Sequence, residues 1–209
     1  IRARLNLPAS YILYSGSARQ DKNLATLIRC FAAVRLQNPE LRDLHLVMEI
    51  SGEQIGLPPL QRLIRQLDLK GHVRVLTQMG DEERRVIFQD ARLLCLMGRA
   101  EGFGFPLLEA QICGVPVVAA DSGALPEVGG PEGAVYVNPD NIAECSSMIE
   151  RVLTDMALRS YLIEHGEQNA RRYDWNACAE RFRQVYELLF YPRDQIALPR
   201  EGWLPALLK

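Results

Sequence analysis

Several patterns that would assign a chain to a particular class of protein are missing from this sequence of 209 residues. Its 5 cysteines never form a Cys-x-x-Cys pair, so the spacing typical of zinc and dithiol redox centres is absent. No Asp-x-Asp motif occurs, which removes a common means of chelating a divalent metal. The longest apolar runs, such as 93–97 and 115–120, fall far short of the ~20 residues that cross a bilayer. We therefore expect neither a metal centre nor a membrane-spanning segment.

Charge and composition exclude further classes of protein. Because 24 basic residues stand against 26 acidic ones, for a net charge of −2, no basic excess indicates a nucleic-acid partner. The length suits one ample core and is short for two. No signal-peptide pattern is present in the sequence, which starts at Ile1, so we expect a cytoplasmic protein. The cysteines that we expect to be reduced and largely within the core are Cys30, Cys95, Cys113, Cys145 and Cys178.

Strand-like and helix-like patterns alternate along the first two thirds of the chain. Short apolar runs predict strands, and between them apolar residues recur at helical spacing, as in the helix that follows Asp21. The carboxylates that start at Asp81 mark another helix start, where the helix dipole favours them. This alternation predicts an α/β fold with a parallel sheet of about six strands and helices on both faces. The predicted strands are residues 11–14, 44–50, 73–76, 93–97, 115–119 and 134–137.

From about residue 140 the pattern is helical only, which predicts a helical C-terminal extension. Prolines at 192, 199 and 205 argue against a helix that continues beyond residue 190. We therefore assign residues 1–190 to one domain and residues 191–209 to a tail that crosses the surface. In the last helix, which follows Asp174, the residues predicted to point inward are Cys178, Phe182, Val185 and Leu189.

The most informative stretch is Glu101–Glu109, which reads Glu-Gly-Phe-Gly-Phe-Pro-Leu-Leu-Glu. Glycine at 104 permits a close approach of the backbone to a ligand, and Pro106 suits the first turn of a helix whose N-terminus would face an anion. Glu109 follows about one turn later, where it could accept hydrogen bonds from hydroxyl groups of the same ligand. Because this stretch and Gly16 each follow a predicted strand, both lie at the sheet edge that binds ligands in such folds.

Together with residues 110–119, this stretch resembles the double-glutamate motif of retaining glycosyltransferases of the group 1 (family 4) kind, which have the GT-B fold. That family usually carries Glu-Gly-Phe-Gly-x-Pro-x-x-Glu-Ala-x-x-x-Gly-x-Pro-Val-Val, and the match is nearly complete. Weaker likenesses at 14–24, 122–128 and 173–175 follow in the family's order. The resemblance implies a Rossmann-like domain that binds a nucleotide-sugar and forms one half of a GT-B fold. The tail 191–209 is expected to cross to an acceptor-binding N-terminal domain that this chain lacks.

The resemblance implies transfer of a sugar from a nucleotide-diphosphate donor to an acceptor hydroxyl. Glu101 and Lys22 are expected to act in catalysis, Glu101 beside the transferred sugar and Lys22 on the phosphates, whose negative charge grows as the bond breaks. Glu109 is expected to bind ribose, the ring of Phe105 to pack, and residues 75–78 to border the base. Neither a metal nor a cofactor is expected. The residues expected to bind the donor are Gly16, Ser17, Lys22, Phe103, Gly104, Phe105, Leu107 and Glu109.

Each charged residue of this set also has a purely structural explanation. Lys22 could be a solvated lysine at a helix start, and Glu101 a carboxylate in a turn. Glu109 could be a carboxylate in the first turns of a helix, stabilised there by the helix dipole.

Two positions depart from the family's pattern. An arginine usually follows the first glycine, where this chain has Ser17, and many relatives have serine where this chain has Gly98. A serine cannot reproduce the bidentate phosphate contacts of an arginine. Arg19 and Arg99 are candidates to replace it, although neither occupies the expected position. Weaker donor binding, a different donor and a decayed activity are the alternatives that follow.

Two other functions stay open. The chain could be a non-catalytic module that binds a sugar nucleotide, or it could belong to a GT-B phosphorylase or epimerase. Members of the family often build polysaccharides or lipid-linked glycans, so peripheral association with the inner membrane face is a further alternative. The arginines around Trp175 are nevertheless more typical of a solvated helix face.

Overall fold

The computed structural model describes residues 1–52 and 56–190. The chain divides into two compact units, one formed by residues 1–171 and one that begins at residue 172. The tail predicted after residue 190 lies outside the described residues. Its crossing to another domain therefore stays a prediction, as does the domain boundary placed at residue 190.

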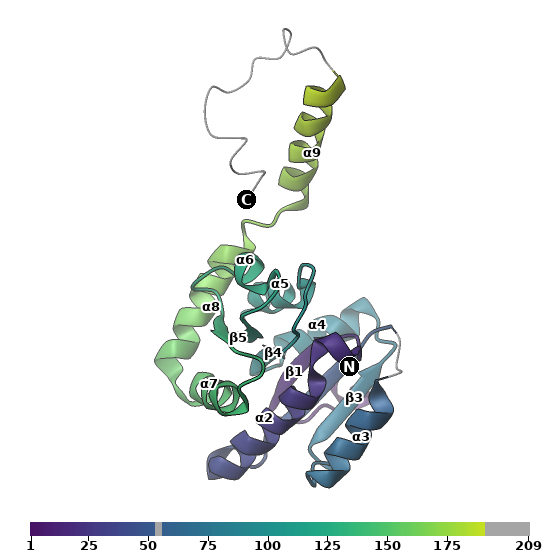
Figure 1. Cartoon of the computed structure of the whole chain (residues 1–209), viewed down its shortest axis with the longest axis vertical. Helices are drawn as coiled ribbons and strands as arrows, with labels where there is room; N and C mark the ends of the chain where they lie inside the picture. Colours follow the sequence, from purple (N-terminus) through teal and green to yellow (C-terminus); the bar gives the residue numbers. More distant parts are fainter. Residues whose placement is uncertain (53–55, 191–209) are drawn as a thin grey trace. The chain divides into compact units, whose positions relative to one another are not determined.

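A parallel six-stranded sheet runs through the first unit (Figure 1). Its strands are β1 (Tyr11–Gly16), β2 (His45–Ile50), β3 (Val73–Thr77), β4 (Leu93–Leu96), β5 (Val117–Ala120) and β6 (Val135–Val137). They pair in the order β3-β2-β1-β4-β5-β6, every pair parallel. Strands covered on both faces read as continuous apolar runs, and β4 and β5 are buried at every position. The predicted α/β class and parallel sheet are confirmed.

Helices cover both faces of this sheet. On one face α2 (Leu24–Gln37) packs beside α3 (Leu57–Gln66) and α7 (Ile142–Thr154). On the other, α5 (Phe105–Ile112) packs beside α4 (Asp81–Gln89), α6 (Leu125–Gly129) and α8 (Met156–Ala170). A four-residue helix, α1 (Arg2–Leu5), precedes the sheet. The apolar residues whose spacing predicted α2 are all buried, namely Leu24, Leu27, Ile28, Phe31 and Val34.

A buried polar network fixes the end of α8 within the first unit. The side-chain amide of Asn169 donates to Oε1 of Gln111 at 2.8 Å and to the carbonyl of Val128 at 2.9 Å. The amide of Gln111 donates in turn to the carbonyls of Gly129 at 2.8 Å and Gly133 at 3.0 Å. Because buried polar groups need partners, this network holds α8 against α5 and α6. The first compact unit ends soon after it, at residue 171.

The strand order reverses at β1, which pairs with β2 on one side and with β4 on the other. The connections after β1 and β4 leave toward opposite faces of the sheet, and this is where open α/β sheets form a ligand-binding crevice. Gly16 ends β1, and the loop 97–104 joins β4 to α5. The two segments singled out in the sequence therefore lie at the same edge of the sheet.

The second unit contains α9 (Trp175–Phe190), which begins where the sequence predicted. Asp174 caps it, since its Oδ1 accepts a hydrogen bond from the N–H of Ala177 at 2.8 Å. The predicted inward orientation is wrong for Phe182 and Leu189, which are 59% and 73% exposed. Helical spacing identifies which residues share a face, but it does not supply the surface that covers that face.

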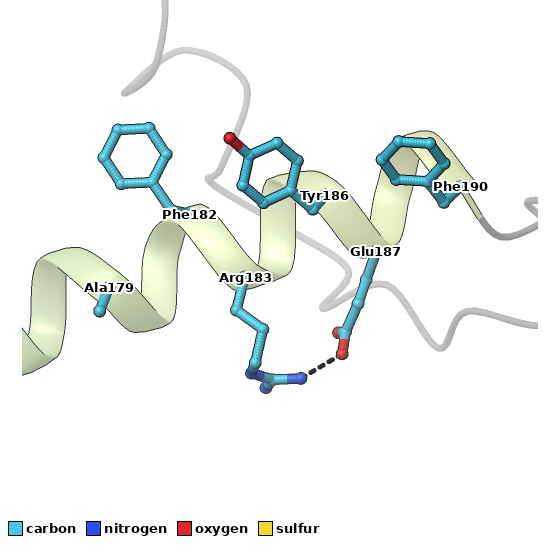
Figure 2. A pocket seen from close by; sticks show the side chains of 6 residues that line it. All are labelled: Ala179, Phe182, Arg183, Tyr186, Glu187 and Phe190. Carbon is cyan, nitrogen blue, oxygen red and sulfur yellow. Dashed lines mark hydrogen bonds and ion pairs between the residues drawn. The ribbon is translucent and has the colours of Figure 1, made fainter.

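Figure 2 shows how three aromatic residues of α9 are arranged. Phe182, Tyr186 and Phe190 project from the same side of the helix and line a pocket, while Arg183 forms an ion pair with Glu187.

No helix in the described part of the chain is both long and apolar enough to cross a membrane.

Candidate functional site

Lys22 and Glu101 form an ion pair at the carboxyl edge of the sheet. The Lys22 Nζ lies 2.7 Å from Oε1 of Glu101, and the two side chains are 16% and 14% exposed. Lys22 ends the short 3-10 turn Gln20–Lys22 after β1, whereas Glu101 lies in the loop between β4 and α5. The sequence predicted a common edge for Gly16 and the Glu101 stretch, and the structure brings Lys22, in the turn after Gly16, into direct contact with Glu101. A partly buried ion pair is screened less by salt than an exposed one, so its attraction is stronger. Each of the two side chains therefore restrains the other.

The backbone of Glu101 is held by the segment that follows β5. The N–H of Ala124 donates to the Glu101 carbonyl at 3.1 Å, and the Ser122 hydroxyl donates to the Arg99 carbonyl at 2.6 Å. Gly123 fits between them with a φ of 60°, and a Cβ there would lie only 2.7 Å from the Glu101 carbonyl oxygen. The motif that the sequence shows after β5 thus has a structural role, because it fixes the loop that carries Glu101.

Gly98, one of the two departures from the family's pattern, lies beside the same ion pair. A Cβ at this position would lie 3.3 Å from Oε1 of Glu101 and 3.6 Å from the Asp21 carbonyl oxygen. A side chain would therefore press on the oxygen that binds Lys22. The next residue, Arg99, donates its N–H to the Asp21 carbonyl at 2.8 Å, which ties the loop after β4 to the turn after β1.

The helix α5 starts at a turn that requires glycine. Gly104 has a φ of 88°, and a Cβ there would lie 2.7 Å from Cδ2 of Leu125. Pro106 occupies the first helical turn, as predicted. The Leu107 side chain is fully buried, and its N–H donates to the Gly104 carbonyl at 2.9 Å. The predicted contact of Leu107 with a donor stays a prediction.

The two phenylalanines of this turn lie against each other at the surface. The ring centroids of Phe103 and Phe105 are 4.7 Å apart, and the residues are 36% and 54% exposed. The packing expected for the Phe105 ring thus involves its neighbour in the turn, and more than half of the residue stays exposed. Donor contacts through the backbone of this turn stay a prediction.

Ser17, the other departure, is held through its backbone. The Tyr14 hydroxyl donates to the Ser17 carbonyl at 2.7 Å. Burial raises the pKa of the Tyr14 phenol far above its ordinary value, and the charge of Glu101 raises it further, so the phenol stays a donor at neutral pH. Gly16, with a φ of 150°, leaves room for this phenol, because a Cβ there would lie 2.8 Å from the hydroxyl oxygen.

The two arginines considered as replacements for the family's arginine are engaged in other ion pairs. Nε of Arg19 lies 2.9 Å from Oδ1 of Asp21, and Nε of Arg99 lies 2.9 Å from Oδ1 of Asp140. The two arginine side chains are 68% and 52% exposed. In the part of the chain that the structure describes, neither arginine forms an ion pair with Glu101 or Glu109.

Glu109 is paired with a cation that the sequence did not predict as part of the site. Arg84, in the first turn of α4, places Nη2 2.8 Å from Oε2 of Glu109 and Nη1 3.2 Å from Oε2 of Glu49. Glu49 is 3% exposed and also accepts a hydrogen bond from the Ser15 hydroxyl at 2.6 Å. The available signal was Glu49 itself, a carboxylate inside an otherwise apolar strand.

Residues 75–78, expected to border the base, reach the same edge of the sheet. β3 ends at Thr77, and the next residue, Gln78, is exposed and has a φ of 56°. That conformation is uncommon for a residue other than glycine, so it marks a sharp change of chain direction before α4. Contact of this segment with a base stays a prediction.

Comparison with known proteins identifies the family. Residues 2–169 match the profile of the family described as Glycosyl transferases group 1. The chain belongs to this family. The predicted membership of the group 1 glycosyltransferases, which rested on the double-glutamate motif, is thereby confirmed.

This group 1 glycosyl transferase chain spans about half the length of the relatives that it matches. O-antigen chain mannosyltransferase B of Escherichia coli is 29% identical over 179 residues, which cover 86% of this chain and 46% of the relative. Sucrose-phosphate synthase from Thermosynechococcus elongatus superposes with a TM-score of 0.79 at 26% identity, over 90% of this chain and 48% of that one. Anabaena HepE, solved in complex with UDP and glucose, has the same fold, with a TM-score of 0.76 at 21% identity over 89% and 50% of the two chains.

The contact between Gly123 and the backbone of Glu101 leads to a stability prediction. Gly123→Ala places a Cβ in a left-handed conformation against backbone atoms, so we expect a loss of about 1–3 kcal/mol in the free energy of unfolding. Gly102→Ala is the matched control, because a Cβ there meets nothing within 4 Å, and we expect a change below about 0.5 kcal/mol. Urea unfolding of both variants measures the difference. Equal stabilities would show that Gly123 does not fix the Glu101 loop.

Proposed function

We propose that this chain is the donor-binding domain of a retaining GT-B glycosyltransferase. It would bind a nucleotide-diphosphate sugar and promote departure of the diphosphate while the sugar passes to an acceptor hydroxyl. The observation that carries the proposal is the Lys22–Glu101 ion pair at the switch point of the sheet, with Glu109 on the helix that follows. Membership of the group 1 glycosyl transferases supports the same reaction class.

The chemistry needs positive charge where the leaving diphosphate becomes more negative. Lys22 supplies an ammonium group that is little exposed, where an electrostatic interaction is stronger than in water. Because an ammonium group has three N–H donors, Lys22 can bind a phosphate oxygen and still hold Glu101. The N-terminus of α5 adds aligned backbone dipoles of the same sign.

The two glutamates have different roles in this proposal. Glu101 accepts hydrogen bonds from hydroxyl groups of the transferred sugar and stabilises positive charge that develops on it. Glu109, about one helical turn into α5, accepts hydrogen bonds from the ribose. Support for separate roles comes from their separate cations, since Lys22 pairs with Glu101 and Arg84 pairs with Glu109.

The acceptor and its binding site belong to a further part of the protein in this proposal. The relatives are about twice as long as the chain, and we propose that an N-terminal domain binds the acceptor and is needed for turnover. The related HepE structure contains UDP and glucose, which makes UDP one of the donor bases to test first. The mannosyltransferase relative makes GDP another, because GDP is a common carrier of activated mannose.

Donor binding is the first prediction of the proposed function. Calorimetric titration of the full-length protein with UDP, GDP and ADP should detect saturable binding of one of them. Glu109→Gln should weaken that binding by about 10- to 100-fold, because it removes a charged acceptor of ribose hydroxyls. Glu164→Gln, at an exposed carboxylate on α8, is the control and should bind like the wild type. Failure of all three nucleotides to bind the folded wild type would refute the proposal.

Turnover tests the catalytic role of Glu101. Donor hydrolysis, in which water takes the place of the acceptor, can be measured as release of the nucleoside diphosphate. We expect Glu101→Gln to lower kcat by about 100- to 1000-fold, a typical loss when a group that stabilises transition-state charge is removed. Turnover equal to that of the wild type would show that Glu101 is not catalytic. Donor binding without turnover in the wild type, even with acceptors, would support a non-catalytic module.

We also propose that the reaction needs no metal ion, because Lys22 and the start of α5 meet the charge of the diphosphate. Among the described residues, no cluster of three or more His, Cys, Asp or Glu side chains is placed to hold a metal ion. Turnover in excess EDTA should stay within about twofold of turnover with added Mg²⁺. A loss of turnover that Mg²⁺ or Mn²⁺ restores would contradict this part of the proposal.

A further inference from the structure

A chain of hydrogen bonds and ion pairs links Glu109 to the interior of the sheet. The Ser15 hydroxyl donates to Oε2 of Glu49 at 2.6 Å, and that same oxygen lies 3.2 Å from Nη1 of Arg84. Nη2 of Arg84 lies 2.8 Å from Oε2 of Glu109. The four residues come from β1, β2, α4 and α5, and all of them lie at the carboxyl edge of the sheet.

Burial of Glu49 and Ser15 restrains the inner end of this arrangement. Glu49 is 3% exposed, and a carboxylate at such a depth requires a paired cation and further hydrogen bonds. Arg84 provides the cation and Ser15 the additional donor. The Arg84 guanidinium also lies over the ring of Phe88, with Cζ 5.9 Å from the ring centroid. Arg84 is therefore restrained by partners that do not belong to the motif.

We propose that Arg84 is a positioning residue that holds Glu109 ready for the ribose, which deepens the proposed function and rests on it. The Glu109 side chain is 41% exposed, and on its own it would sample several rotamers. Arg84 binds Oε2 and leaves Oε1 to accept a ribose hydroxyl. The ordering of Glu109 thus precedes donor binding, which lowers the entropy cost of binding.

The arrangement differs from what direct phosphate binding by Arg84 would require. Both terminal nitrogens of its guanidinium are already engaged, one by each glutamate. A phosphate ligand would have to share this guanidinium with two carboxylates, whose negative charges already neutralise it and would repel the phosphate. The geometry therefore favours action through Glu109 over replacement of the arginine that the family has at the position of Ser17.

The test measures ribose preference in the full-length protein. The probes are UDP, GDP and ADP, each compared by calorimetry with its 2′,3′-dideoxy form and with the corresponding nucleoside monophosphate. We expect the wild type to prefer the ribose form of its nucleotide by about tenfold or more, because buried groups that bind hydroxyls reject analogues without them. Glu109→Gln should lose most of this preference. Arg84→Gln should bring it to within about threefold of the Glu109→Gln value, and the double variant should lose nothing further.

Two controls separate positioning from folding. Arg84→Gln leaves Glu49 without its cation, so Arg84→Gln combined with Glu49→Gln removes that buried charge and should retain the fold by circular dichroism. This combination should show the same loss of ribose preference. Arg85→Gln, at the next and exposed residue of α4, should keep the preference within about twofold of the wild type.

Three outcomes would overturn the inference. Ribose preference that survives in Arg84→Gln would show that Glu109 needs no positioning by Arg84. Equal weakening of the ribose and dideoxy diphosphates in Arg84→Gln, with a smaller effect on the nucleoside monophosphates, would assign Arg84 to the diphosphate instead. If the wild type bound none of the three nucleotides, the proposed function itself would fail and this inference with it, whereas the first two outcomes leave the proposed function standing.

Discussion

The parallel pairing of β1 with both β2 and β4 is the constraint on which the rest of the site depends. Parallel strands all point in one direction, so the segments that follow them gather at one edge. The turn after β1 carries Lys22, and the loop after β4 carries Glu101. The 2.7 Å contact between Lys22 and Glu101 joins these two connections where the strand order reverses. The hydrogen bond from the Arg99 N–H to the Asp21 carbonyl joins them a second time.

A second consequence of this topology is that each carboxylate of the motif is paired with a cation. The motif places two carboxylates close together in the sequence, and the proposed ligand brings a diphosphate to the same edge. Each carboxylate is paired with a cation from another element, Glu101 with Lys22 and Glu109 with Arg84. These pairs reduce the repulsion that a diphosphate would meet, and they fix the direction of each carboxylate before a ligand arrives. Electrostatic preorganisation of this kind is the main way in which such a site can stabilise a leaving group.

The sequence predicted those parts of the fold and site that depend on local pattern. The apolar character of the strands allowed all six to be predicted, including β3, which contains Arg74 and is buried only at Leu76, and strand-then-turn spacing placed Gly16 and the Glu101 stretch at one edge. The link through Arg84 could not be predicted, because its contact with Glu49 depends on how α4 leaves β3 and on the register of β2 against β1. The exposure of Phe182 on α9 was missed for a related reason, since periodicity defines a face and not its partner.

The two departures from the family's pattern have different physical consequences. Gly98 removes a side chain from beside Oε1 of Glu101, so it favours an undisturbed pair with Lys22. Ser17 removes a guanidinium from the turn after β1, and Arg19 and Arg99 are engaged elsewhere. If the donor binds as proposed, the diphosphate depends on Lys22 and on the start of α5, while Arg84 serves the ribose end. In that proposal the serine affects the diphosphate end of the site, while the ion pairs of both glutamates are kept.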